Sequence, residues 1–192
     1  MLITELGLAV DVGRHLDALG VRWLVGGSVA SSILGLPRAT VDVDLVADLR
    51  GVHVTALYDA LIHDYYVDRD TMRWAVSTRR SFNAIHQASM IKVDVFCAGD
   101  DPLTRGELER RVFVDLAIGR VPLCSSEDII LQKLVWWREA GGSERQWRDA
   151  IGVVQIRGAE LDRTYIDGHA AKLGLTELVA RLFAEAAGAT GP

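Results

Sequence analysis

Two aspartates stand two residues apart in an apolar segment, Val41-Asp42-Val43-Asp44-Leu45-Val46. Side chains alternate across a β-strand, so Asp42 and Asp44 would share one face, about 7 Å apart along it. Like charges repel and Asp is disfavoured in strands, so a cation between the carboxylates would stabilise the pair. Mg²⁺ suits such oxygen ligands, because it binds a few carboxylates together with substrate phosphates. The alternative is a solvated acidic face.

A third aspartate, Asp94, stands in a second alternating segment, Ile91-Lys92-Val93-Asp94-Val95-Phe96. If this strand pairs beside the first one, three carboxylates converge. Such a set could hold two metal ions about 3.5–4 Å apart, the arrangement that serves phosphoryl transfer. Asp94 could also accept the proton of an attacking hydroxyl. The alternative is a polar residue on an exposed strand face.

The segment Gly26-Gly27-Ser28 follows an apolar strand and precedes a short helix. Glycine lets backbone approach a ligand closely, and a helix N-terminus with a Ser hydroxyl binds phosphate well. The same three residues also make an ordinary N-cap turn. Neither the P-loop pattern nor the dinucleotide-binding glycine pattern occurs in the sequence.

Together these residues resemble the DNA polymerase beta-type nucleotidyltransferase superfamily. The resemblance rests on Gly26-Gly27-Ser28, on the block Arg38-Ala39-Thr40-Val41-Asp42-Val43-Asp44, and on Asp94. The form Arg-x-Thr-x-Asp-x-Asp is most similar to abortive-infection nucleotidyltransferase toxins of type IV toxin–antitoxin systems. The resemblance covers about residues 20–150 and is most specific over 26–46.

The resemblance implies a mixed β-sheet flanked by helices, an α/β (α+β) class, and transfer of a nucleoside monophosphate from an NTP such as ATP. The acceptor would be a hydroxyl of RNA, tRNA or protein, pyrophosphate would leave, and an antitoxin would be a partner. Asp42, Asp44 and Asp94 would be catalytic and would bind two Mg²⁺ ions. The implied nucleotide-binding residues are Gly26, Gly27, Ser28, Arg38, Thr40 and Asp149.

The toxin-like relatives also carry a Lys on a later helix and an Arg-Asp pair after it, which Lys133 and Arg148-Asp149 match. The resemblance implies that Lys133 is a catalytic residue that contacts phosphate, and that Asp149 orients it or a neighbour. Alternatively, the Lys133 stem snorkels along an apolar face, and Asp149 belongs to a plain polar helix face. Arg38 is either a cation near the phosphates or a solvated loop charge.

Elements that would position these residues follow from apolar spacing and breakers. We expect helices near 3–19, 29–34 and 52–63, and strands over 21–25, 41–46, 90–96 and 111–118, with a mixed region at 65–89. From Ser125, a capping residue, the pattern becomes helical, with helices from 125, over 144–157 and over 176–187. We therefore predict a nucleotidyltransferase core over 1–124 and a helical segment over 125–192 that packs on it.

Composition agrees with one ordinary globular chain of 192 residues, 49% hydrophobic and 24% charged. Its formal net charge of −5 disfavours a strongly basic nucleic-acid binder. No leader or membrane-spanning run is recognised, and we read Cys97 and Cys124 as buried reduced thiols. These features predict a cytoplasmic protein with no membrane partner.

Two other functions compete with the transferase. Nucleotide-sugar glycosyltransferases also use Asp-x-Asp with a metal, but place it after a longer nucleotide-binding half than the 40-odd residues that precede Asp42. The second is a non-catalytic module of the nucleotidyltransferase fold that binds NTP or a partner. It predicts a missing carboxylate or a blocked Ser28, and the sequence has neither.

Overall fold

The computed structural model describes residues 2–40, 42–100 and 102–188. The chain divides into two compact units. Unit 1 consists of Met1–Val29 and Ala39–Cys124, and unit 2 of Ala30–Arg38 and Ser125–Pro192. Residues 30–38, which we expected in the core segment, thus belong to the same unit as the C-terminal helices. A domain boundary at Ser125 stays a prediction.

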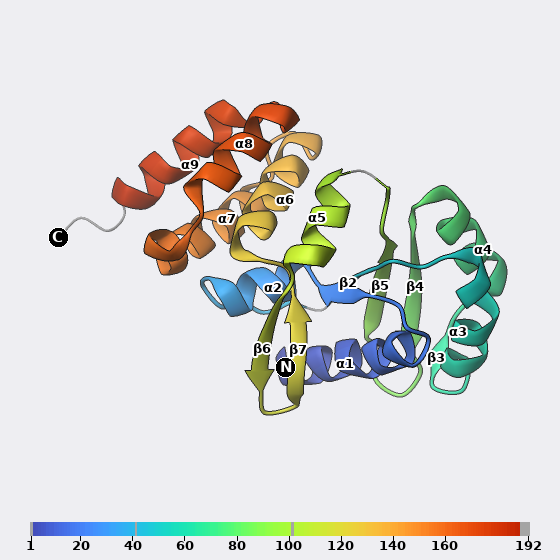
Figure 1. The fold of residues 1–192 in the computed structure, drawn as a ribbon. Coiled ribbons are helices and arrows are strands. Elements are labelled where there is room, and N and C mark those ends of the chain that lie inside the picture. The colour runs from blue at the N-terminus through green and yellow to red at the C-terminus, as the bar shows by residue number, and fades with distance from the viewer. Residues whose placement is uncertain (1, 41, 101, 189–192) are drawn as a thin grey trace. The chain divides into compact units, whose positions relative to one another are not determined.

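A mixed β-sheet forms the centre of unit 1 (Figure 1). Over the described residues it has seven strands, in the order β3-β4-β5-β2-β1-β7-β6. Their bounds are β1 (Trp23–Val25), β2 (Asp42–Ala47), β3 (Tyr65–Tyr66), β4 (Ser81–His86), β5 (Lys92–Cys97), β6 (Val112–Leu116) and β7 (Gly119–Leu123). Strand β2 is antiparallel to β1 and parallel to β5, and β1 is parallel to β7. The predicted α/β class with a mixed sheet is confirmed.

Unit 1 also contains the helices α1 (Leu2–Ala18), the 3₁₀ turn η1 (Gly51–His53), α3 (Val54–Leu61), α4 (Arg69–Thr78) and α5 (Pro102–Arg110). Of these, α1 and α4 pack against strands of the sheet. Helix α1 packs against β1, β2 and α3. Val43 and Leu45 of β2 are fully buried, and so are Val12 and Leu16 of α1. Apolar burial on one strand face therefore leaves the other face to polar side chains. Val41, expected at the start of this strand, lies outside the described residues.

Helix α2 (Gly27–Leu34) begins two residues after β1, and the division between the units falls within it. Gly27 has φ +56°, a left-handed conformation that glycine adopts at no steric cost. This tight turn sets Ser28 in the first turn of the helix, as its sequence context predicted.

Unit 2 is helical. Besides the C-terminal part of α2, it contains α6 (Ser126–Glu139), α7 (Glu144–Arg157), the 3₁₀ turn η2 (Gly158–Glu160), α8 (Arg163–Leu173) and α9 (Thr176–Gly188). The predicted cap is confirmed, because the Ser125 hydroxyl accepts the N–H of Asp128. Gly35 lies against the backbone of α7, where a Cβ would come within 2.6 Å of the Val153 nitrogen.

Several elements differ from the sequence prediction. The strand expected over 111–118 is the shorter β6, and a turn at 117–118 leads into a further strand, β7, which begins at Gly119 with φ +120°. The mixed region contains the whole helix α4, capped by the Asp68 side chain at its start and ended by Arg79 in the left-handed conformation. Helices α5 and α8 were not predicted, because their short sequences carry few apolar residues at helical spacing.

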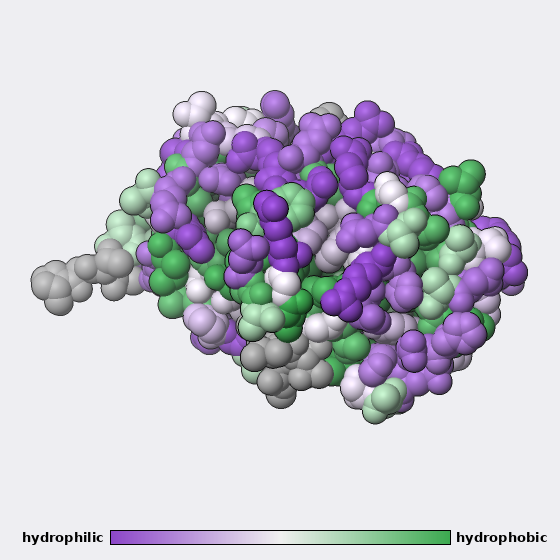
Figure 2. Space-filling model, turned by 60° about the horizontal axis from the view of Figure 1, so that its bottom comes forward, coloured by the Kyte–Doolittle hydropathy of each residue, from purple (hydrophilic) through white to green (hydrophobic). Residues whose placement is uncertain are grey.

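Hydrophilic and hydrophobic residues are interspersed over the face drawn in Figure 2. Isolated exposed apolar side chains, such as Trp74, are normal on a protein surface. Within the described ranges, no helix has both the length and the apolar content needed to cross a bilayer. Cys97 and Cys124 are buried free thiols, as expected.

Candidate active site

The two aspartate strands pair with each other, which is the condition for their carboxylates to come together. Strands β2 and β5 are parallel, and Asp44 stands directly beside Asp94, while Asp42 stands beside Lys92. Neighbouring strands lie about 4.8 Å apart, so the Asp44 and Asp94 backbones are close neighbours. All four residues are half-buried, whereas Val43 is fully buried. We call Asp42, Asp44, Lys92 and Asp94 the carboxylate face of unit 1.

The glycine turn lies against this face. The Gly26 N–H donates to the Asp44 carbonyl at 2.9 Å, which fixes the end of β1 beside β2. A Cβ on Gly27 would overlap the carboxylate of Asp44. Only glycine therefore allows the carboxylate to lie against the turn that leads into Ser28. The Thr40 hydroxyl donates to the Asp42 carbonyl at 3.3 Å, which steadies the entry into β2.

Lys92 is a site residue to which we had assigned no role. Its ammonium donates to Asp94 Oδ2 at 2.7 Å. The hydrogen bond to Asp94 and the charges of Asp94, Asp42 and Asp44 raise the pKa of Lys92 despite its partial burial. The signal was present in the sequence, because Lys92 and Asp94 stand two residues apart and so share one strand face.

The carboxylate face has the ligand chemistry for metal ions, but its side chains are not gathered round one point. The donors are hard oxygens on adjacent rigid strands, and the buried Oδ1 of Asp94 has no hydrogen-bond partner among the described residues. An unsatisfied buried oxygen is costly, so a cation there would stabilise it. However, no three carboxylate, His or Cys side chains of the described ranges are gathered closely enough to hold an ion. The residues fit a divalent ion in chemistry and register, provided that their side chains rotate and Lys92 releases Asp94.

Unit 2 contains a second charged cluster, formed by Arg38, Lys133 and Asp149. The Arg38 guanidinium donates to both oxygens of Asp149, from Nε at 2.7 Å and from Nη2 at 2.9 Å. Lys133 Nζ donates to Asp149 Oδ2 at 2.8 Å. The side chains of Lys133 and Asp149 are 0% and 4% exposed. Both alternatives are therefore wrong: Lys133 does not snorkel to solvent, and Asp149 does not belong to an exposed polar face.

Burial alone would raise the pKa of the Asp149 carboxyl. The hydrogen bonds and charges of Arg38 and Lys133 outweigh that effect and hold the pKa of Asp149 below its usual value. The Asp149 carboxylate is thus ionised and accepts hydrogen bonds from two cations. Because these groups are shielded from water, each charge depends on its partners for stabilisation.

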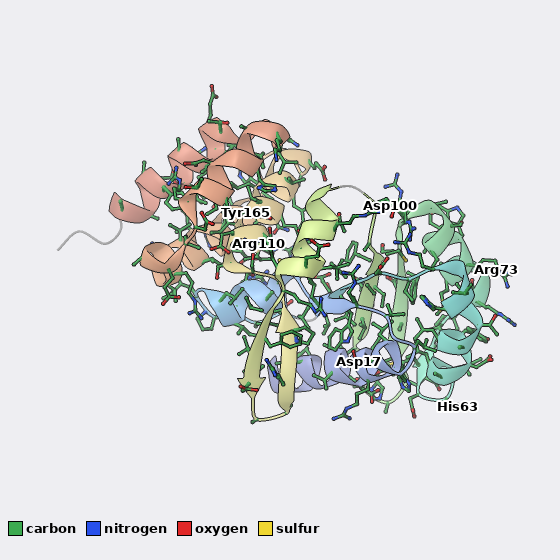
Figure 3. All side chains as sticks on the ribbon, in the orientation of Figure 1. Asp17, His63, Arg73, Asp100, Arg110 and Tyr165 are labelled. Atoms are coloured by element: carbon green, nitrogen blue, oxygen red, sulfur yellow. The ribbon has the colours of Figure 1, made fainter. Side chains whose placement is uncertain are left out.

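Unit 2 contains another fully buried carboxylate, Asp128, which lies on the same helix as Lys133. Asp128 accepts the hydroxyl of Ser125 at 2.7 Å and that of Tyr165 at 2.6 Å. Tyr165 lies on α8, as Figure 3 labels it, so Asp128 links α6 to α8. These contacts give Asp128 a structural role that its capping position only partly predicted.

The sequence-predicted site residues thus occur in two groups. Unit 1 contains Gly26, Gly27, Ser28, Thr40, Asp42, Asp44 and Asp94, and unit 2 contains Arg38, Lys133 and Asp149. Direct contacts join Gly26 and Gly27 to Asp44, and Asp149 to both Arg38 and Lys133. The roles predicted for them stay predictions.

Comparison with known proteins gives no match to a family model and none to a curated protein. Solved structures do match. The antibiotic-resistance factor ANT(2'')-Ia aligns with a TM-score of 0.57 at 16% identity, over 94% of this chain and 99% of that chain. The lincomycin-bound lincosamide antibiotic adenylyltransferase LnuA aligns with a TM-score of 0.52 at 12% identity, over 80% and 96%.

An antigenic nucleotidyltransferase-like protein from Paracoccidioides brasiliensis also aligns, with a TM-score of 0.52 at 19% identity, over 79% of this chain and 76% of that chain. At such identities the likeness concerns the fold. The predicted fold is confirmed: this chain has the fold of the nucleotidyltransferases.

Proposed function

We propose that this protein is a metal-dependent nucleotidyltransferase that moves a nucleoside monophosphate from an NTP to an acceptor hydroxyl. The observation that carries the proposal is the parallel register of Asp44 beside Asp94, with the glycine turn lying on Asp44. Transfer of a phosphoryl group needs charge stabilisation and alignment more than covalent chemistry from the protein. A rigid pair of strands carrying carboxylates supplies both.

Asp42, Asp44 and Asp94 would hold two Mg²⁺ ions, which neutralise phosphate charge when bound. Ser28 and the first N–H groups of α2 would donate to the triphosphate, because a helix N-terminus favours anions. The free Oδ1 of Asp94 would accept the proton of the attacking hydroxyl. Lys92 would first leave Asp94 Oδ2 and then neutralise phosphate charge in turn.

Arg38, Thr40, Lys133 and Asp149 belong to the same proposal through the motif resemblance. Because Lys133 is fully buried and paired with Asp149, its contact with phosphate would require that pair to open. A supporting role, in which Asp149 holds the Arg38 guanidinium in one orientation, needs no such movement.

The acceptor is the open part of the proposal. A toxin-like role in the cytoplasm, with RNA, tRNA or protein as acceptor and an antitoxin as partner, follows from the motif resemblance. The structural neighbours suggest a small hydroxylated acceptor instead, since one is a lincosamide adenylyltransferase and another was solved with adenylyl-2''-tobramycin. Both acceptor classes belong in the assay.

The test is incubation of the protein with each α-labelled NTP, Mg²⁺ and, in turn, total RNA, cell extract, an aminoglycoside and a lincosamide. We expect label on one acceptor, and loss of labelling by about 10²–10⁴-fold in Asp94→Asn. Asp59→Asn is the matched control, because Asp59 is an exposed carboxylate on α3. Labelling that survives in Asp94→Asn would refute the assigned site.

One observation favours a second candidate, an NTP-binding module without turnover. Lys92 already neutralises Asp94, and the carboxylates are not gathered round a single point. This candidate predicts NTP binding without label transfer to any acceptor, and Lys92→Gln would not create transfer. Under the transferase proposal, by contrast, Asp94 must be released from Lys92 during each cycle.

A further inference from the structure

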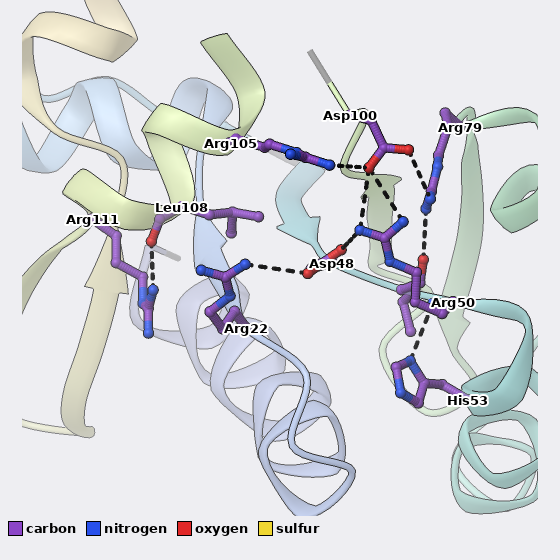
Figure 4. A network of polar contacts seen from close by, with 10 residues as sticks. Arg22, Asp48, Arg50, His53, Arg79, Asp100, Arg105, Leu108 and Arg111 are labelled. Carbon is purple, nitrogen blue, oxygen red and sulfur yellow. Dashed lines mark hydrogen bonds and ion pairs between the residues drawn. The ribbon is translucent and has the colours of Figure 1, made fainter. Parts of the chain in front are cut away.

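A second polar cluster of unit 1 lies at the opposite ends of β2 and β5 from Asp42 and Lys92, just after Ala47 and Cys97 (Figure 4). It gathers four arginines on two aspartates: Arg22, Arg50, Arg79 and Arg105 with Asp48 and Asp100. We call it the arginine cluster. The proposed transferase function assigns it no part.

The two carboxylates of the cluster are shared. Asp100 accepts from Arg105 at 2.9 Å, from Arg50 at 3.3 Å and from Arg79 at 3.5 Å. Asp48 accepts from Arg50 at 2.7 Å and from Arg22 at 3.4 Å. The hydrogen bond from Arg105, with the charges of Arg50 and Arg79, lowers the pKa of Asp100. Asp100 is therefore ionised near neutral pH.

Positive charge exceeds negative charge in this cluster. Four guanidinium groups face two carboxylates, and each guanidinium has five N–H donors while each carboxylate accepts at two oxygens. Three of the described contacts are longer than 3.2 Å, beyond the usual range of a charge-assisted hydrogen bond. In a chain with a net charge of −5, such a local excess of donors is a distinct feature.

Neighbouring contacts fix the Arg79 side chain and the backbone at Arg50. Arg79 Nη1 donates to the Leu49 carbonyl at 2.8 Å, and the backbone N–H of Arg50 donates to His53 Nδ1 at 3.1 Å. Figure 4 shows these groups converging from separate elements on the ends of the two strands. Preorganised donors lose less entropy when they bind a ligand, which favours a binding site over a flexible surface.

A cavity of about 160 Å³ opens among these groups. Arg22, Arg50 and Arg105 line it together with Asp48, Glu109 and the backbone at Gly99. The cavity is small and polar, so it suits a compact anion rather than a nucleoside.

We propose that this cavity binds a phosphate group. Guanidinium forks match the oxygens of phosphate in a bidentate manner. A tetrahedral phosphate presents enough acceptors for three arginines at once, whereas a carboxylate has two oxygens. With Asp48, Asp100 and the neighbouring Glu109, the four arginines leave a formal excess of one positive charge, which an anion would offset. The phosphate would come either from a free anion or from a phosphate of a nucleic acid.

The experiment is equilibrium dialysis of the whole protein, with EDTA present, against labelled inorganic phosphate, pyrophosphate and a short single-stranded RNA. EDTA removes the metal on which the candidate active site depends. The test variant is Arg22→Gln with Arg105→Gln. The matched control is Arg73→Gln with Arg148→Gln, which removes the same charge from exposed arginines outside the cavity. Far-ultraviolet circular dichroism confirms that each variant is folded.

We expect saturable binding of at least one probe by the wild type, and a loss of about tenfold or more in the test variant. The control variant should retain wild-type affinity. Binding of phosphate or pyrophosphate identifies a free anion, and cavity-dependent binding of RNA alone identifies a nucleic-acid phosphate. Absence of binding for all three probes, or equal weakening in the control, would overturn the proposal.

Glu109→Gln tests the same site through an expected increase in phosphate affinity, whereas the arginine variant tests it through a decrease. Removal of a negative charge from the cavity wall should strengthen phosphate binding by about twofold to fivefold. Unchanged or weaker binding would contradict the proposed position of the anion. Asp42→Asn with Asp44→Asn should leave the affinity unchanged, which separates this site from the candidate active site.

Discussion

The carboxylate face of unit 1 and the Asp149 cluster of unit 2 carry opposite charge imbalances in different surroundings. In unit 1, three half-buried carboxylates stand on one face with Lys92, whose ammonium pairs with Asp94. In unit 2, one buried carboxylate holds two cations, Arg38 and Lys133. Carboxylates that solvent can reach can be neutralised by a ligand that binds reversibly. A buried carboxylate must instead be neutralised by cations of the protein itself. We therefore infer that the first group serves binding and that the second mainly serves stability.

The largest expected effect is on the buried cluster. Asp149→Ala removes the buried carboxylate that pairs with both Arg38 and Lys133, which should lower the free energy of unfolding by about 3–5 kcal/mol. Urea denaturation measures this change. Asp70→Ala is the control, because Asp70 pairs with Arg73 at the surface and is 87% exposed, so its loss should cost less than about 1 kcal/mol. Equal losses for the two variants would end the distinction between the clusters.

The contribution of the Asp149 cluster to stability should also be lost at acid pH. Because the pKa of Asp149 is lower in the folded than in the unfolded state, its contribution to stability is present above the unfolded value, near pH 4, and is lost as the pH falls through the folded value. Urea denaturation of the wild type from pH 7 to pH 2 should therefore show a loss of stability below pH 4. In Asp149→Asn, less stable throughout, that part of the slope should be missing. An unchanged slope would contradict the assignment.

A smaller effect is expected where the glycine turn lies on the carboxylate face. Gly27→Ala puts a Cβ into the Asp44 carboxylate and forces a left-handed conformation, which costs about 1–2 kcal/mol and should displace Asp44. We expect lower thermal stability together with weaker Mg²⁺ binding. Gly7→Ala, in the open on helix α1, should instead stabilise the protein by about 0.5–1 kcal/mol. Unimpaired Mg²⁺ binding in Gly27→Ala would show that the glycine turn does not position the metal-binding carboxylates.

The smallest expected effect is on the stability of the carboxylate face without metal. Asp42→Asn with Asp44→Asn should raise the metal-free stability by up to about 1 kcal/mol, or about 2–4 °C in melting temperature, because it removes like-charge repulsion among the neighbouring carboxylates. Differential scanning calorimetry with and without Mg²⁺ makes the measurement. A lower melting temperature in the double variant would show that the carboxylates are already well neutralised.

Local sequence patterns predicted the carboxylate face well. Strand alternation assigned Asp42, Asp44 and Asp94 to polar faces, and the pairing of β2 with β5 brought two of these residues side by side. The same alternation applied to Lys92 but received no weight, because a lysine on a strand is commonplace. The contact of Arg38 with Asp149 joins residues 111 positions apart, so no local pattern could predict it.

Helices without strong apolar spacing were missed for a related reason. Helix α4 depends on its Asp68 cap and on Arg79 in the left-handed conformation at its end. Side-chain capping and an unusual backbone angle are set by local geometry, which composition alone does not reveal. The second strand of the hairpin, β7, was likewise missed, because it follows the strand predicted over 111–118 after a turn of two residues.

The central claim is that the carboxylate face binds a metal–nucleotide complex. Thermal-shift titration with each NTP in the presence of Mg²⁺ tests it most directly, with Asp44→Asn and Asp59→Asn measured in parallel. The account predicts that one Mg·NTP stabilises the wild type and Asp59→Asn, by about 2.7 kcal/mol at a hundredfold excess over Kd, and leaves Asp44→Asn unchanged. No response of the wild type to any Mg·NTP, or an equal response in Asp44→Asn, would contradict it.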